Sequence, residues 1–274
     1  MDAVIHIPQN ELRDAIDYCW YHESGNMQLS TYNIPFLHQE LIINFGGHFS
    51  VTGAAQPSFQ YSRQGGVSGL YTQPVITRVK GHYKALGIML KPFGLYRLCG
   101  FAATKLSGRL LTLTDIWGAS AVSLTDALEA AELTTDKFRI LEQYLLRKAR
   151  PQTIPEEVLA LQDQGSLRKG HISANISGKL ISSKKYIQSC GEVFGMTPKK
   201  YVQLSLVNAA VAQIAAQPEM PLTEVAYDQG FYDQAHFIRI FKSFTGITPS
   251  KYKYAVQRGL THATFPNVIF DTAL

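Results

Sequence analysis

Strand-type and helix-type hydrophobic patterns occupy different parts of this chain. Between residues 28 and 90, short runs of β-branched and aromatic residues, such as LIINF at 41–45, alternate with glycine and proline. Runs of this kind between turn residues are typical of an antiparallel sheet. A turn is expected at Gly81, between PVITRV and ALGIML. From Leu95 onward apolar residues recur at helical spacing. The pattern predicts an α+β protein with its sheet in the first part.

Two amphipathic helices are expected over residues 120–150. The segment 123–133 begins with Ser123 and Asp126 at the spacing of a capping box, and 137–150 carries an apolar stripe and ends in cations. Pro151 and Pro155 then mark a domain boundary. We therefore predict two domains and a tail: a β-rich domain at 1–151, an all-α domain at 155–258 and a terminal segment at 259–274.

The all-α part repeats itself. FGMTPKKY at 194–201 and TGITPSKY at 245–252 share Gly-x-Thr-Pro-x-Lys-Tyr, and Gly195 and Gly246 are 51 positions apart. A fixed offset of this length indicates a supersecondary unit that is used twice. Each copy is expected to close one helix and to begin the next.

The second unit has the sequence features of a helix-turn-helix. A short helix at 222–231 ends in Gly230, and Asp233 then stands at the N-cap of a second helix. That second helix has a polar and cationic side opposite one apolar stripe. The stripe consists of Phe237, Ile240, Phe241 and Phe244.

The first unit, at 172–194, follows the same plan. Its first helix would carry Ile172 and Ile176, and Ser182 would cap the second helix. An Ala/Val/Leu-rich helix at 199–217 would join the two units. A helix of that length spans roughly 27 Å, close to one turn of B-DNA at about 34 Å. Two reading helices held in this way could enter successive major grooves.

Composition and charge support a DNA partner. The net charge is +5, and residues 166–258 hold twelve lysines and arginines against five acidic residues. Basic segments attract phosphate-bearing partners. The three cysteines, Cys19, Cys99 and Cys190, lack CxxC spacing, which argues against disulfides and structural zinc. We see no signal peptide and no run of about 20 apolar residues, so we expect a cytoplasmic protein.

Residues 155–258 resemble the DNA-binding domain of the AraC/XylS-type transcriptional regulators. The resemblance is densest in GFYDQAHFIRIFKSFTGITPSKY at 230–252. It implies about seven helices in two helix-turn-helix units, and a cupin-like antiparallel β barrel or sandwich as the N-terminal sensor. It further implies sequence-specific binding to double-stranded DNA, a small-molecule effector and a homodimer. We expect the dimer contact in the helices at 123–148, because they are amphipathic and lie between the two domains. The first unit departs from the family pattern at Leu180 and Gly191.

The outward sides of the two reading helices supply the candidate DNA contacts. Arg239 faces away from the apolar stripe, and arginine commonly reads guanine through O6 and N7. Gln234 could pair with adenine or pack at the turn. Apolar residues on the same side could touch thymine methyl groups or the neighbouring helix. The candidates are Lys184, Lys185, Ile187, Gln188, Gln234, Ala235, His236, Ile238, Arg239 and Lys242.

Two further groups complete the expected sites. Lysines at the helix starts would contact phosphates and make affinity sensitive to salt; these are Lys199, Lys200, Lys251 and Lys253. An effector pocket in the N-terminal domain would involve Tyr32, His38, Glu40 and Asn44.

Two alternatives stay open. A cupin-like enzyme with a helical appendage would need His38, Glu40, His48 and His82 to converge on a divalent metal. The dense histidine motif of such enzymes is missing, as are a nucleophile elbow, a P-loop, GxGxxG and HExxH. We therefore expect no enzyme, no metal and no cofactor. The other alternative is a DNA-binding regulator without an effector, whose β-rich domain serves only for dimerisation and has a filled core.

Overall fold

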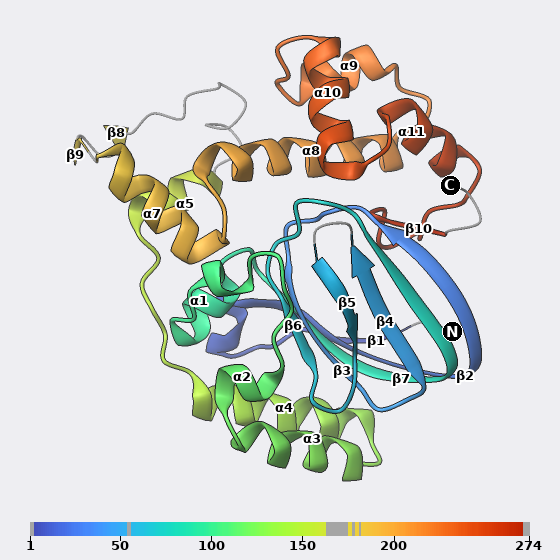
Figure 1. The fold of residues 1–274 in the computed structure, drawn as a ribbon, viewed down its shortest axis with the longest axis vertical. Coiled ribbons are helices and arrows are strands. Elements are labelled where there is room, and N and C mark those ends of the chain that lie inside the picture. The colour runs from blue at the N-terminus through green and yellow to red at the C-terminus, as the bar shows by residue number, and fades with distance from the viewer. Residues whose placement is uncertain (1–2, 54–55, 163–174, 177–178, 181, 271–274) are drawn as a thin grey trace.

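The computed structural model describes residues 3–53, 56–162, 175–176, 179–180 and 182–270. An antiparallel sheet forms the N-terminal part, and a group of helices forms the C-terminal part (Figure 1). The predicted fold class, an α+β protein with a helix-turn-helix region after a sheet-rich first part, is confirmed. No helix in the described residues is long and apolar enough to cross a membrane.

Two long strands, β2 and β7, organise the sheet. They pair over nearly their whole length, and the far edge of β7 pairs with β4 along one half and with β3 along the other. The inner face of the curved sheet carries an aromatic core that includes Phe49, Tyr61 and Tyr83. The strands are β1 (Val4–His6), β2 (Ile16–Asn33), β3 (Gln39–Asn44), β4 (His48–Gly53), β5 (Gln56–Gln60), β6 (Gly66–Ser68), β7 (Val75–Leu90) and β10 (Val268–Phe270).

The long strands correct the sequence prediction at two points. β7 runs through Gly81, where a turn was expected, because glycine accommodates the local φ of 92° without ending the ladder. β2 begins at Ile16, well before residue 28. Each strand supplies ladder hydrogen bonds to the other, and this distant pairing outweighs the local punctuation.

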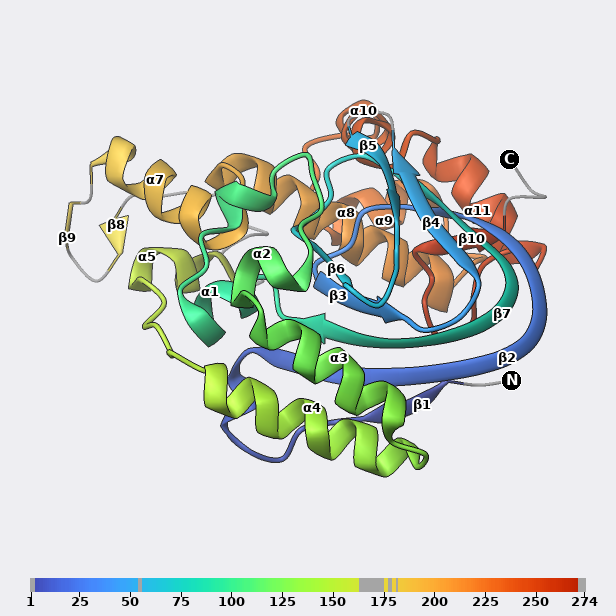
Figure 2. The same ribbon diagram turned by 60° about the horizontal axis from the view of Figure 1, so that its bottom comes forward.

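Helices of the N-terminal part cover the outer face of the sheet (Figure 2). Leu124, Leu128, Leu141 and Leu145 of α3 and α4 pack in one core with Leu86 of β7. This is the amphipathic arrangement that the apolar stripe of 137–150 predicts. The helical elements are η1 (Glu11–Asp14), α1 (Gly94–Cys99), η2 (Ala103–Leu106), α2 (Leu113–Trp117), α3 (Ser120–Ala130) and α4 (Thr134–Lys148).

The expected capping box at Ser123 is wrong. α3 begins three residues earlier, at Ser120, and its N-cap Ala119 offers no side-chain hydrogen bond. The capping box of this region lies instead at α2, where the Thr112 side chain accepts from the Asp115 backbone N–H and the Asp115 carboxylate accepts from Thr112. The preceding turn through Gly118, at φ 65°, sets where α3 begins.

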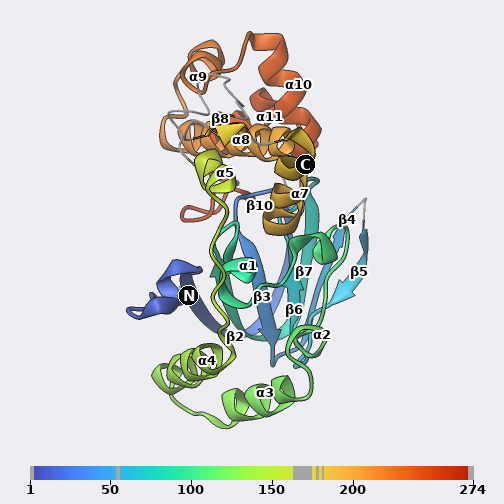
Figure 3. The ribbon, with the colours of Figure 1, turned by 90° about the vertical axis from the view of Figure 1, so that its left-hand side faces the viewer.

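The C-terminal helices lie at one end of the sheet, and α3 and α4 lie at the opposite end (Figure 3). The long helix α8 carries α7 near its start and α9, α10 and α11 near its far end (Figure 1). These elements are α5 (Glu156–Leu159), η3 (Ala160–Gln162), α7 (Ser183–Phe194), α8 (Pro198–Ala216), α9 (Leu222–Asp228), α10 (Gln234–Thr245) and α11 (Pro249–Gln257).

The first helix of the first unit is contradicted where the structure describes it. β8 (Asn175–Ile176) and β9 (Lys179–Leu180) pair as a short antiparallel ladder within the expected helix. Asn175-Ile-Ser-Gly-Lys-Leu180 contains turn-forming residues that disfavour a helix interior. Ile172, also expected in that helix, lies outside the described residues.

The tail returns to the sheet. β10 pairs antiparallel with β2, with Ile269 opposite Tyr32, and Ile269 is fully buried. Its side chain belongs to the core that holds the C-terminal helices together. The tail therefore joins the two domains, whereas the sequence left it unassigned.

Candidate nucleic-acid interface

Helix α10 presents the polar side that the second unit requires. Asp233 caps it, because its carboxylate accepts the backbone N–H of His236 at 2.7 Å. The four apolar residues of the predicted stripe are buried, with Phe237 and Phe241 at 0% exposure. The opposite side is thereby fixed toward solvent. Its exposed side chains are Gln234, Ala235, Ile238, Arg239 and Lys242.

His236 lies at the flank of this surface. Its ring is half-buried, lies 5.8 Å from the Phe231 ring, and its Nδ1 accepts the backbone N–H of Tyr232 at 3.4 Å. These contacts hold the turn between α9 and α10. His236 therefore supports α10 from its side.

Helix α7 carries the first unit's candidates. Ser182 caps it through the Lys185 N–H at 3.3 Å, as predicted. Lys184, Lys185 and Ile187 are exposed. Gln188 is also exposed, but its amide donates to Glu192 at 3.0 Å on the same helix. A base contact by Gln188 would compete with that bond.

The other end of α7 rests on the N-terminal domain. Gly195, at φ 76°, ends the helix, and a Cβ there would lie 3.0 Å from the carbonyl oxygen of Ala103 in η2. On the other side of the helix, the Ser189 hydroxyl donates to Glu157 of α5 at 3.1 Å. The first unit is thus anchored to its neighbours.

The repeated motif has the same structural role in both copies. Gly195 and Gly246 adopt left-handed backbone angles that end α7 and α10. Thr197 and Thr248 then cap α8 and α11 by accepting the N–H groups of Lys200 and Lys251. A proline follows each threonine at the first helical position, and each motif tyrosine is buried. The expectation that each copy closes one helix and begins the next is confirmed.

The lysines at these helix starts divide into two groups. Lys199, Lys200 and Lys251 are exposed, as a phosphate contact requires. Lys253 is half-buried, and its Nζ donates to the carbonyl oxygen of Met220 at 2.8 Å. Lys253 therefore fastens α11 to the loop before α9, and we correct its assignment from a phosphate contact to an internal tie.

Two exposed tyrosines escaped the sequence analysis. Tyr232, in the turn before α10, is 91% exposed, and Tyr227, on α9, is 84% exposed. Tyrosine is enriched at interaction surfaces, because it combines an apolar ring with a polar hydroxyl. Their place beside α10 could have been read from GFYDQ at 230–234, where the tyrosine follows the glycine turn.

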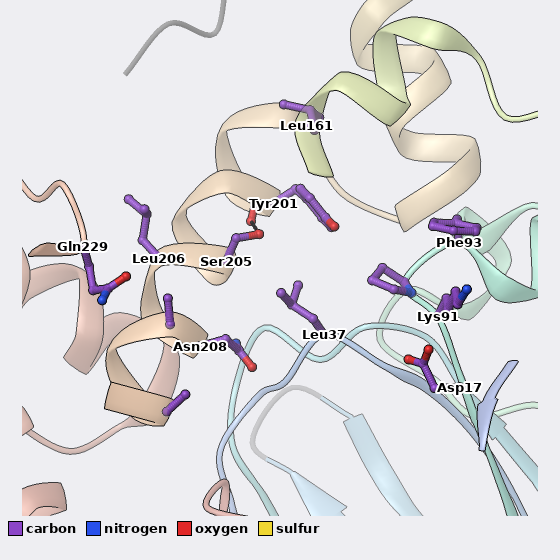
Figure 4. A pocket seen from close by; sticks show the side chains of 13 residues that line it. Asp17, Leu37, Lys91, Phe93, Leu161, Tyr201, Ser205, Leu206, Asn208 and Gln229 are labelled. Atoms are coloured by element: carbon purple, nitrogen blue, oxygen red, sulfur yellow. Dashed lines mark hydrogen bonds between the residues drawn. The ribbon is translucent and has the colours of Figure 1, made fainter. Parts of the chain in front are cut away.

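A cavity of about 550 Å³ lies between the two domains (Figure 4). Leu37, Lys91 and Phe93 line it from the N-terminal domain. Tyr201, Ser205 and Asn208 of α8 line it from the other side. The lining combines apolar surface with one cation and several hydrogen-bonding groups, which is typical of a small-molecule site.

None of the four predicted pocket residues lines this cavity, so the expected effector pocket does not coincide with it. The Tyr32 hydroxyl donates to the carbonyl oxygen of Thr245 in the C-terminal domain at 2.8 Å. Asn44 holds a turn by donating to the carbonyl oxygens of Gly47 and Tyr61. The alternation of side chains along a strand cannot reveal hydrogen-bond partners from other parts of the chain. Asp17, which lines the interdomain cavity, pairs with His38 at 2.8 Å.

Glu40 is the unusual titrating group of the sheet. It lies on the β3 face that carries Ile42, toward Tyr61 and Tyr83. Burial raises the pKa of Glu40 to about 7, against the opposing effect of the nearby His38. The carboxyl therefore exchanges its proton near neutral pH.

The residues needed for a metal enzyme are engaged elsewhere. His48 bonds to Ser50, and His82 pairs with Glu23 at 3.3 Å. In the described part of the chain, no group of three or more His, Cys, Asp or Glu side chains could hold a metal ion. Burial raises the pKa values of Cys19 and Cys190 to about 12, so neither thiol is activated.

Comparisons with known proteins agree with this arrangement. Residues 180–255 match a family described as a helix-turn-helix domain, and residues 5–112 match a domain of unknown function, DUF6597. An uncharacterised HTH-type transcriptional regulator of Haemophilus influenzae is 25% identical over 130 residues. That match covers 43% of each chain, so it spans less than half of the relative's length.

Some solved structures have a low similarity to this chain over most of its length. A ToxT variant from Vibrio cholerae, without ligand, has a TM-score of 0.47 and 12% identity, covering 86% of this chain and 97% of its own. Wild-type ToxT bound to an unsaturated fatty acid has a TM-score of 0.43 and 16% identity, covering 86% and 94%. The AraC-like transcriptional activator CuxR has a TM-score of 0.32 and 9% identity, covering 94% and 84%.

Residues 180–255 are therefore a helix-turn-helix domain, built around the capped helix α10 and its exposed polar side. The Gly-x-Thr-Pro-x-Lys-Tyr motif, on which the resemblance to AraC/XylS-type regulators partly depends, stands at the start of both α8 and α11.

Proposed function

We propose that this protein is a transcriptional regulator that binds double-stranded DNA sequence-specifically through α10 and α7. The exposed face of α10 carries the proposal, because it places Arg239, Gln234 and Lys242 on one solvent-facing side of a firmly packed helix. A helix of this kind fits the major groove of B-DNA. A protein of this function works in the cytoplasm, beside the chromosome.

The two units have different parts in this proposal. Arg239 reads a guanine through O6 and N7, and Gln234 in the first turn reads an adenine. Lys242 and the exposed lysines of α7 and α8 contact phosphates, which sets affinity but not sequence preference. α8 has 19 residues, and so a length of about 28 Å, which would separate the two reading helices by nearly one DNA turn.

The effector in this proposal occupies the interdomain cavity. The inner face of the sheet is filled by aromatic side chains, whereas the space between Lys91, Phe93 and α8 is hollow. A ligand there touches both domains at once. It can therefore shift the placement of the DNA-binding helices by binding one arrangement more tightly, and about 1–3 kcal/mol of coupling is enough.

A homodimer completes the proposal. Leu133, between α3 and α4, leaves 64% of its surface exposed at the tip of the helical hairpin. Pairing of two such tips would cover apolar surface that a monomer leaves in water. Sedimentation equilibrium of the wild type and of Leu133→Ser tests this, since only the wild type should associate.

Selection from a random duplex pool at about 0.15 M salt tests the DNA-binding function. The expected result is enrichment of one site that carries two short boxes about one helical turn apart. Binding that falls with salt but never distinguishes one sequence from another would overturn sequence-specific recognition. Enrichment of a single box would retain α10 as a reader and remove α7 from that role.

A further inference from the structure

A second cavity, of about 540 Å³, lies between α3 and α4, on the helices that cover the outer face of the sheet. Leu124, Ala127 and Ile140 supply apolar lining. Three cations also line it: Arg147 and Lys148 in the last turn of α4, and Arg150 just beyond that helix. We name this cavity the hairpin groove.

Hydroxyl groups lie beside these cations. Ser120 donates to the carbonyl oxygen of Trp117 at 2.8 Å, and its hydroxyl lies 3.0 Å from that of Tyr144. Both residues line the hairpin groove, together with Ser123. Since Ser123 does not cap α3, its hydroxyl is available to a ligand.

The cations are not neutralised by the protein. Within the described residues, Arg147, Lys148 and Arg150 form no ion pair, whereas Arg139 on the same helix pairs with Asp136 at 2.9 Å. Lys148 Nζ lies 5.7 Å from the centre of the Tyr144 ring, which holds it beside the hydroxyls. Positive charge is therefore concentrated at one end of the groove.

The start of α3 adds to this field. α3 has eleven residues, its first turn has no acidic side chain, and its N-cap residue gives no side-chain hydrogen bond. The partial positive charge of a helix N-terminus therefore meets the cations of α4 at the same end of the hairpin. Convergent cations and a free serine hydroxyl beside an apolar surface are suited to an anion that carries an apolar body.

We propose that the hairpin groove binds a small organic anion, a carboxylate or a phosphate ester with a short apolar chain. The acidic group contacts Arg147, Lys148 and the hydroxyl of Ser123, and the chain lies along Ala127 and Ile140. This site is separate from the interdomain cavity and does not depend on the DNA-binding function. The N-terminal domain thereby has a ligand-binding site of its own.

Calorimetric titration of the full chain with hexyl phosphate, hexanoate, inorganic phosphate and hexanol tests the proposal and separates the two anion sources. The expected result is saturable binding of at least one organic anion and none of hexanol. In Arg147→Gln/Lys148→Gln that affinity should fall at least about tenfold. In Arg139→Gln, a matched control on the same helix, it should change less than about twofold.

A second variant keeps the cations and fills the groove. Ala127→Trp should abolish binding of the organic anion, and its circular dichroism spectrum and melting curve report whether the hairpin is intact. The proposal fails if neither organic anion saturates, if hexanol binds as well as they do, or if both variants bind like wild type. It also fails if the double variant alters only the sedimenting mass, because the cations would then serve contact between copies.

Discussion

The hydroxyl of Tyr32 in β2 donates a 2.8 Å hydrogen bond to the carbonyl oxygen of Thr245, the last residue of α10. A β-sheet residue thereby holds the end of the proposed DNA-reading helix. Two further hydrogen bonds join the N-terminal and C-terminal parts. Gln73 donates to the carbonyl oxygen of Ser243 in α10 at 3.0 Å, and Asn208 of α8 donates to the carbonyl oxygen of Pro35 at 3.2 Å. A shift of the sheet against α8 would therefore be transmitted to α10.

Gly246 tests how closely this contact is packed. It has φ 72°, and a Cβ at this position would collide with the Tyr32 hydroxyl. Gly246→Ala should lower the free energy of unfolding by about 1–3 kcal/mol, from backbone strain and the clash together. Urea unfolding measures this. Gly259→Ala is the matched control, since Gly259 has φ 66° and open space around it, and it should cost about 1 kcal/mol.

The clash can be separated from the strain. In a Tyr32→Ala background the added cost of Gly246→Ala should fall toward that of Gly259→Ala. An equal cost of Gly246→Ala with and without the tyrosine ring would show that the two residues are not coupled.

The strand β10 should control the strength of the domain contact. Ile269 is fully buried against the C-terminal core, so Ile269→Ala should destabilise the protein by about 2–4 kcal/mol. Hydrogen exchange at Ile34 reports the local effect, because its N–H donates to the carbonyl oxygen of Asn267 at 2.9 Å. Exchange at Ile34 should accelerate in the variant. Val268→Ala, at a half-buried position, should change it much less; unchanged exchange in Ile269→Ala would contradict a tethering role for β10.

The sequence predicted the second unit well because its signals are local. Asp233, Gly246 and Thr248 act within three or four residues of their own positions, so their spacing is sufficient. The sheet was predicted less well, because β2 and β7 stabilise each other although their paired residues lie 42 to 74 positions apart, and this pairing overrides the signal of Gly81. No local pattern could show where the tail would pair.

The candidate site shows the same difference. Arg239 and Lys242 are exposed because they lie opposite the apolar stripe of α10, and that stripe can be read directly from the sequence. Lys253 was misassigned because its partner, Met220, lies in another loop. The four-residue pocket failed for a similar reason: Tyr32 and Asn44 have partners that only the tertiary structure brings to them.

Glu40 should make stability depend on pH. Its pKa of about 7 lies above the ordinary value of 4.5, so the folded state binds the proton more tightly. The contribution of Glu40 to the free energy of unfolding is therefore greatest below pH about 4–5. It is lost as the pH rises through about 7, and the total loss is up to roughly 3 kcal/mol. Glu40→Gln should abolish that decline, and at pH about 8 it should be more stable than wild type. Parallel pH profiles of the two proteins in urea unfolding would contradict a raised pKa.

Filling the interdomain cavity should mimic or block the effector. Ala209 lines the cavity, whereas Ala216 is exposed near the end of the same helix. Ala209→Trp should therefore change affinity for a selected DNA site by at least about fivefold, within the range of allosteric coupling. Ala216→Trp should leave it within about twofold. Fluorescence anisotropy with labelled duplex measures both; equal affinities would show that the cavity is not coupled to α10.

The most direct test of sequence-specific reading by α10 is a base-pair substitution scan of the selected site. Wild type, Arg239→Ala and the control Arg139→Ala would each be titrated with every single substitution at fixed salt. We predict that Arg239→Ala costs about 1–3 kcal/mol on the parent site and loses discrimination at one G·C pair only. Arg139→Ala should behave as wild type. A uniform loss of affinity across all substitutions would contradict base recognition by Arg239 and reduce its role to a phosphate contact.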